Sequence, residues 1–146
     1  MGRGSSTLEP AALSFLSAVD TDLGLDAVLF LRRTGLVLAS WTREGIRLDI
    51  VSVMAATMLA SIDTIVETLG GSAPKSVSVD SGQHRMVATK VNSKAFLVVV
   101  APKRVSRRIV RMATHDLLAH LAASTVEQAH KEKTAGEDRV NVRPHR

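Results

Sequence analysis

The fold of this chain is decided by residues 51–71, VSVMAATMLASIDTIVETLGG. Apolar side chains recur there at intervals of three and four residues, which is the spacing of one face of an amphipathic helix. Gly70 and Gly71 follow the last apolar residue, and Pro74 lies just beyond them, a common way for a helix to end. The pattern therefore predicts a helix over residues 48–69.

The two sides of this helix differ in character. We expect one side, an arc of about 140°, to cover a sheet with the residues Val51, Met54, Ala55, Met58, Leu59, Ile62, Ile65, Val66 and Leu69. The opposite side is small and almost uncharged, and it contains Ile50, Val53, Ala56, Thr57, Ala60, Ser61 and Thr64. Because alanine is simply a good helix former, this side is either an exposed surface of low charge or a seam with a second helix.

Short β-rich segments lie on both sides of the long helix. The predicted strands are residues 26–33, 36–41, 75–81, 84–91 and 94–101. Thr34 and Gly35 connect the first two as a hairpin turn would, and short turns also separate the last three. The segment 75–81 alternates and is polar, which favours an edge strand, whereas 94–101 is apolar throughout, which favours a central strand.

The length of 146 residues is typical of one domain. Further helices are predicted at residues 8–20 and 104–130, with a flexible leader at 1–6 and a disordered charged tail at 131–146, so that one domain occupies 7–130. The order of elements is helix, strand, strand, helix, strand, strand, strand, helix. With hairpin connections it predicts an α/β (α+β) fold, a three-layer α/β/α sandwich around a mainly antiparallel five-stranded sheet.

Composition excludes several kinds of function. The chain has no cysteine, which excludes disulfides, thiolate metal sites and cysteine nucleophiles and agrees with a cytoplasmic location. No uninterrupted apolar run reaches about 18 residues, so we expect no membrane span, and the N-terminus lacks the pattern of a signal peptide. Gly2 followed by Ser6 matches the loose myristoylation pattern, and whether Gly2 is lipidated stays open.

Three groups of residues contain the residue types of known chemical sites. They are Gly70-Gly71-Pro74-Lys75-Ser76, Asp80-Ser81-His84 and His115-Asp116-His120. The first has proline where a phosphate-binding loop requires glycine, and the second straddles a predicted hairpin without an oxyanion hole. The third places its histidines about 140° apart on a helix, too far to share a metal ion. We therefore expect no catalytic residue, no cofactor and no metal.

The net charge of +5 is concentrated at the C-terminal end, because residues 1–102 are balanced and residues 103–146 carry the whole excess. A basic cluster marks the start of the last predicted helix: Lys103, Arg104, Arg107, Arg108 and Arg111. Such a cluster is either a solvated face or a contact for an acidic or phosphate-bearing partner. A module that binds nucleic acid through this helix and the tail is thus an alternative function, although scarce aromatic residues disfavour single-stranded ligands.

The element order and several local sequences resemble the roadblock (dynein light chain type) domain, in the profilin-like/longin-like group. The resemblance lies in the hairpin LFLRRTGLVLAS, the long helix, the polar strand KSVSVDSG, the strand KAFLVVVA and a terminal helix. It covers roughly residues 8–125, and it is closest in kind to prokaryotic small-GTPase regulators of the gliding-motility type. Members often carry an acidic residue before the hairpin glycine, where this chain has Arg33 and Thr34.

The resemblance implies a homodimeric, non-catalytic regulator or scaffold that binds a Ras-like small GTPase, or a scaffold subunit of a larger adaptor complex. In such a dimer the long helices pack together and the edge strands join the two sheets. The dimer contacts would be Val53, Ala56, Thr57, Ala60, Ser61, Thr64, Val77 and Val79. Candidate partner contacts are Arg43, Arg47, Arg104, Arg107, Arg108 and Arg111.

Overall fold

The computed structural model describes residues 15–19 and 21–121. Its elements, in chain order, are a helical turn over residues 15–18, the 3-10 helix η2 (Thr21–Leu23), β1 (Ala27–Arg32), β2 (Val37–Thr42), α2 (Leu48–Thr68), β3 (Ser76–Asp80), β4 (His84–Lys90), β5 (Ala95–Pro102) and a final helix over residues 107–121. The five strands and α2 agree with the predicted bounds to within one residue. Gly2, the leader 1–6, most of the helix 8–20 and the tail 131–146 lie outside the described residues.

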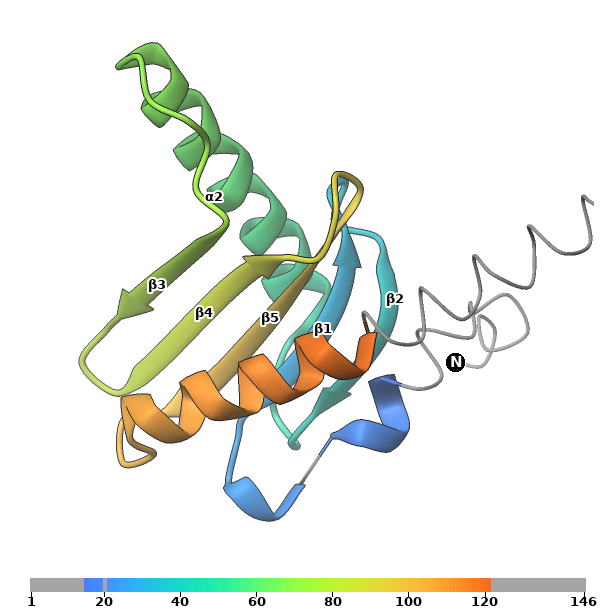
Figure 1. The fold of residues 1–146 in the computed structure, drawn as a ribbon. Coiled ribbons are helices and arrows are strands. Elements are labelled where there is room, and N and C mark those ends of the chain that lie inside the picture. The colour runs from blue at the N-terminus through green and yellow to red at the C-terminus, as the bar shows by residue number, and fades with distance from the viewer. Residues whose placement is uncertain (1–14, 20, 122–146) are drawn as a thin grey trace, which may run out of the picture.

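The sheet is antiparallel throughout, with the strand order β2-β1-β5-β4-β3. β5 lies in the centre and β3 at one edge, so both of these predictions are confirmed. The α2 helix covers one face of the sheet and the final helix crosses the other (Figure 1). The predicted three-layer sandwich with a five-stranded antiparallel sheet is therefore correct.

Strand alternation divides the interior into two cores. Side chains at successive positions of a strand point to opposite faces, so β1 and β5, which are covered on both sides, are apolar at almost every position. The core beneath the final helix includes Val28, Phe30, Leu97 and Val99. The core beneath α2 includes Leu29, Leu31, Phe96 and Val98.

The C-terminus of α2 is closed as the glycine pair predicted. Gly70 has a φ of +88°, a conformation that glycine adopts without a steric penalty. The amide of Gly70 donates to the carbonyl of Glu67 at 3.0 Å, and the amide of Gly71 donates to the carbonyl of Val66 at 2.9 Å. These two bonds make a Schellman motif, which satisfies carbonyls that the helix itself leaves without a donor.

The N-terminal half of α2 lies directly on the turn between β1 and β2. Gly35, in that turn, has a φ of +98° and is buried. A Cβ atom at Gly35 would lie 3.4 Å from the Cα of Val53 and 3.5 Å from the carbonyl oxygen of Ser52. Glycine is therefore needed at this position both for its backbone angle and for the close approach of the helix.

The final helix begins later than predicted. The expected start was residue 104, but Lys103 and Arg104 form a turn closed by the Val105 amide, which donates to the Pro102 carbonyl at 3.0 Å. The side chain of Ser106 then accepts a hydrogen bond from the Ile109 amide at 3.2 Å. A serine that bonds the third amide of the first turn is a helix N-cap, so Ser106 sets the start of the helix at residue 107.

The face of α2 that packs on the sheet is also different from the predicted one. Its buried residues are Ser52, Ala55, Ala56, Leu59 and Asp63. Met54, Ile65 and Leu69 were expected in the core but are 57%, 58% and 81% exposed. The physical reason is twofold: small side chains let the helix sit close to Gly35, and its C-terminal turns extend past the strand ends (Figure 1).

Candidate interaction site

One side of α2 is exposed and carries no charged residue. This exposed α2 face consists of Ile50, Val53, Met54, Thr57, Ala60, Ser61, Thr64 and Ile65. Roughly half of each large apolar side chain in it is accessible, between 50% and 58%. Contiguous exposed apolar surface rimmed by polar residues is typical of a protein interaction site.

The middle of the exposed α2 face is smooth. Ala60 and Ser61 are small, and Thr57 donates its hydroxyl hydrogen to the Val53 carbonyl of the preceding turn at 3.0 Å. The hydroxyl of Thr57 is thereby satisfied within the helix. A second helix could approach this part of α2 closely without leaving that hydroxyl unpaired.

The edge strand β3 lies beside this surface. Val77 is half-buried and packs with the core beneath α2, while Val79 is 39% exposed. Val79 and Val51 of α2 line one shallow groove of about 260 Å³. Within the described residues β3 pairs with β4 alone, so its outer edge is open.

Seven of the eight predicted dimer residues therefore lie on α2 or β3 with some or all of the side chain accessible. Ala56 is the exception. It is 6% exposed, and its Cβ lies 3.6 Å from the position of a Cβ at Gly35. Ala56 is a core residue beneath α2, and its assignment to the dimer seam was wrong because the helix is rotated relative to the predicted wheel.

A buried carboxylate fixes the orientation of α2. Asp63 accepts a hydrogen bond from Arg33 Nη2 at 2.7 Å and another from Lys90 Nζ at 2.9 Å. Burial alone would raise the pKa of the Asp63 carboxyl, but the bonds from Lys90 and Arg33 outweigh it and hold that pKa below its usual value. Sequence reasoning missed this cluster, although Asp63 is the single charged residue between Asp49 and Glu67.

Replacing Asp63 by asparagine should destabilise the protein by about 2 kcal/mol at neutral pH, because two partly buried cations lose their counter-charge. The lowered pKa means that this stabilisation is present above the unfolded-state pKa of about 4 and disappears as the pH falls through the folded-state value. Urea unfolding should therefore show the gap between the wild type and Asp63→Asn narrowing toward about pH 3. Glu67→Gln, an exposed site on the same helix, should have almost no effect; a similar loss there would contradict the assignment.

The predicted partner arginines at the start of α2 have different roles. Arg47 precedes the helix and pairs with Asp49 at 2.9 Å, with both side chains largely exposed. Arg43 is tied to the scaffold instead, since its Nε donates to the carboxylate of Asp26, which is 3% exposed. The other carboxylate oxygen of Asp26 faces Nε2 of His84 at 3.6 Å.

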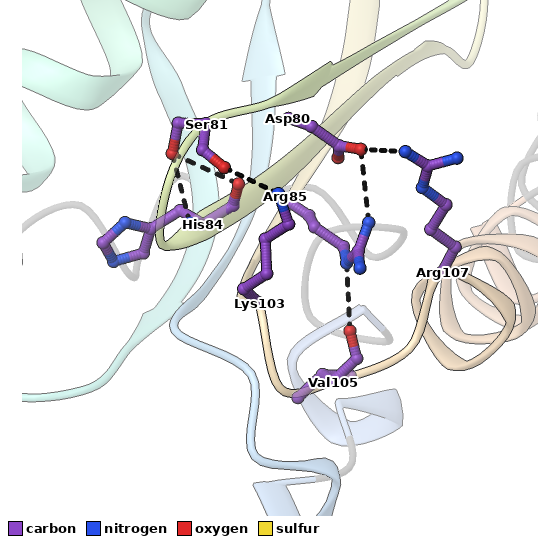
Figure 2. A network of polar contacts seen from close by, with 7 residues as sticks. All are labelled: Asp80, Ser81, His84, Arg85, Lys103, Val105 and Arg107. Atoms are coloured by element: carbon purple, nitrogen blue, oxygen red, sulfur yellow. Dashed lines mark hydrogen bonds and ion pairs between the residues drawn. The ribbon is translucent and has the colours of Figure 1, made fainter.

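The members of the basic cluster have different surroundings. Arg107 pairs with Asp80, which also accepts a hydrogen bond from Arg85 at 3.2 Å (Figure 2). The bond to Arg107, above all, holds the pKa of Asp80 below its usual value. Arg104 lies in a separate hollow, beside Arg43. Arg107 and Arg111 line a groove between β3, β4 and the final helix, whereas Arg108 lines neither the hollow nor the groove.

Asp80, Ser81 and His84 are close together but turn to different partners. The Ser81 hydroxyl accepts a hydrogen bond from the His84 backbone amide at 3.1 Å, which closes the β3–β4 turn (Figure 2). Asp80 points to the arginines, and the His84 ring lies near Asp26. The three residues thus form a structural turn rather than a relay from acid to base to nucleophile.

By length and composition α2 could also cross a membrane, and it is the single described helix with this property. About 28% of the relevant window is buried in the fold. Close packing on Gly35 and the bonds from Arg33 and Lys90 to Asp63 attach α2 to the sheet, so its apolar character reflects one packed face and one uncharged exposed face.

An α/β/α sandwich with an uncharged exposed helix face and an open edge strand has the kind of surface that protein interaction domains present. Residues 14–101 match the Roadblock/LC7 domain family, and the chain belongs to this family. Members of the family are generally regulatory rather than catalytic. No curated protein matches the chain significantly.

Solved structures support the same fold. MglB from Myxococcus xanthus matches with a TM-score of 0.72 and 17% identity, over 83% of this chain and 92% of that one. The gliding protein MglB from Thermus thermophilus has a TM-score of 0.70 and 17% identity, over 82% and 93%. Profilin IA from Acanthamoeba castellanii has a TM-score of 0.55 and 16% identity, over 78% and 98%. At these identities the similarity establishes the fold.

Proposed function

We propose that this chain is a homodimeric, non-catalytic regulator or scaffold that binds a Ras-like small GTPase in the cytoplasm. The observation that carries the proposal is the exposed α2 face, which has no charged residue and about half-exposed apolar side chains. Membership of the Roadblock/LC7 family and the similarity to MglB structures support the regulatory role.

A second copy of the chain is the occupant that suits the exposed α2 face. The face is self-complementary in size, because small residues at Ala60 and Ser61 alternate with larger ones at Val53 and Met54 along the helix. A two-fold axis through such a seam would bring the open edges of two β3 strands together, which would satisfy their unpaired backbone groups.

The GTPase would meet a surface that includes the start of α2. Arg47 is exposed there, and a cation near a nucleotide-binding protein can contact its phosphates or acidic switch loops. A scaffold subunit of an adaptor complex would share the fold but would bind its partner regardless of the nucleotide. The nucleotide dependence of binding therefore separates a regulator from a scaffold.

The full chain should bind its cognate small GTPase, and the first candidate is a GTPase encoded beside it. The affinity should differ between the GDP-loaded and the GTP-analogue-loaded forms of that GTPase. Isothermal titration measures this directly. Arg47→Glu should weaken binding about 10-fold, whereas Lys94→Glu, in the exposed β4–β5 turn, should leave it unchanged. Absence of binding in both nucleotide states would refute the proposal, and equal affinities would favour the scaffold.

A further inference from the structure

The sheet face opposite α2 contains a large groove. It has a volume of about 780 Å³, which lies within the range of pockets that hold ligands. Alternate residues of β3 and β4 make its floor, and the final helix makes its wall. Both contribute small or apolar side chains, among them Ser78, Val87, Thr89, Val110, Thr114 and Leu118.

The groove follows from the path of the final helix. The helix is attached to β3 at its first residue, where Arg107 pairs with Asp80. From there it crosses the sheet away from β3 toward β1 and leaves the outer strands uncovered on this face (Figure 1). Asp80 pairs with Arg85 and Arg107 (Figure 2), and all three residues line the groove.

The charge around the groove is strongly positive. Among the described residues, its lining contains four cations, Lys75, Arg85, Arg107 and Arg111, and one carboxylate, that of Asp80. The formal net charge of these five side chains is three positive units. Asp80 engages Arg85 and Arg107, whereas Lys75 and Arg111 have no ion-pair partner within residues 15–19 and 21–121.

We propose that this groove binds an acidic amphipathic segment of a partner protein. Carboxylates of the segment would pair with Arg111 and Lys75, and an apolar residue would pack between Val87 and Leu118. This combination of an apolar floor and unpaired cations is suited to a helix or strand with one acidic side. The site is distinct from the exposed α2 face, because it lies on the other face of the sheet, and its β3 floor adjoins the edge that would pair in the proposed dimer.

A peptide suits the groove better than nucleic acid does. Among the described residues that line the groove, none is phenylalanine, tyrosine or tryptophan, so it lacks the large aromatic platforms on which bases usually stack. Arg104 and Arg108 lie outside it, so only part of the basic cluster would contact a phosphate backbone bound in the groove. The groove also combines charge with apolar contacts, which a phosphate chain does not use.

The test uses the full chain and a fluorescein-labelled peptide of glutamate and leucine, with leucine at intervals of three and four residues. Fluorescence anisotropy should show binding that Arg111→Glu weakens at least ~10-fold. Ser78→Trp, which fills the groove without changing its charge, should weaken binding to a similar extent. Arg108→Glu is the matched control on the same helix and should leave binding unchanged, as should Lys94→Glu in the β4–β5 turn.

Several results would overturn this assignment. They are no binding of the acidic peptide, equal weakening by Arg108→Glu and Arg111→Glu, or tighter binding of a DNA oligonucleotide than of the peptide at the same salt concentration. Lys75→Glu should weaken peptide binding and leave GTPase binding as in the wild type, because Lys75 lines the groove and is not among the candidate GTPase contacts. Failure of the groove is therefore distinguishable from failure of the regulatory proposal.

Discussion

Replacing Ala60 by arginine should convert the proposed dimer into folded monomers. Ala60 lies at the centre of the exposed α2 face and is itself exposed, so the arginine can remain in water in the monomer. In the dimer it would be forced into an apolar seam, and two-fold symmetry would place two such charges there. We expect dimer dissociation to become at least ~100-fold easier, about 3 kcal/mol.

Light scattering over a range of protein concentrations measures this change, and circular dichroism checks that the chain stays folded. Ala119→Arg is the matched control, because Ala119 is an exposed alanine on the final helix, away from α2. Ala119→Arg should retain the dimer. If Ala60→Arg remained as stable a dimer as the wild type, the exposed α2 face would not be the seam.

Replacing the neighbouring Leu59 by arginine should unfold the domain. Leu59 is fully buried, packed with the core beneath α2. Burying an unpaired charge at this position lowers the free energy of unfolding by more than the few kcal/mol that are lost when a buried leucine is truncated. This loss approaches the whole free energy of unfolding of a typical domain. Far-UV circular dichroism and urea unfolding should show loss of cooperative structure at room temperature.

A milder substitution at the same site measures how much the Leu59 side chain contributes to stability. Leu59→Ala should stay folded but lose about 2–5 kcal/mol, measured by urea unfolding. Leu59→Arg and Ala60→Arg therefore test the two sides of α2 separately. Leu59→Arg should change the stability of the fold, and Ala60→Arg should change the association of two copies. A folded Leu59→Arg protein would mean that α2 packs on the sheet with a different side.

The candidate site was only partly predictable. The long uncharged side of α2 was visible in the sequence, because it needs nothing but the periodicity of a helix. The residues that bind Asp63 were not, since Arg33 and Lys90 lie 30 and 27 positions away from it along the chain. The groove beside β3 was likewise invisible, because it depends on the angle at which the final helix crosses the sheet.

Local patterns were sufficient wherever neighbouring residues decide the structure. The alternation of apolar and polar residues identified the strands. Thr34 and Gly35 identified the first hairpin turn, and Gly70 and Gly71 identified the end of α2. Each of these features depends on backbone preferences within a few residues. The order of strands and helices then limited the sheet to an antiparallel arrangement within three layers.

Tertiary structure decided which side of α2 meets the sheet. An apolar moment predicts the core side only when the whole helix is covered, but the C-terminal turns of α2 extend past the strands and leave Ile65 and Leu69 exposed. Close approach at Gly35 favours the small Ala56 over a larger side chain, and the bonds from Arg33 and Lys90 lock the rotation through Asp63. These contacts join residues distant in sequence, so the three-dimensional packing alone determines the surface that this protein offers to a partner.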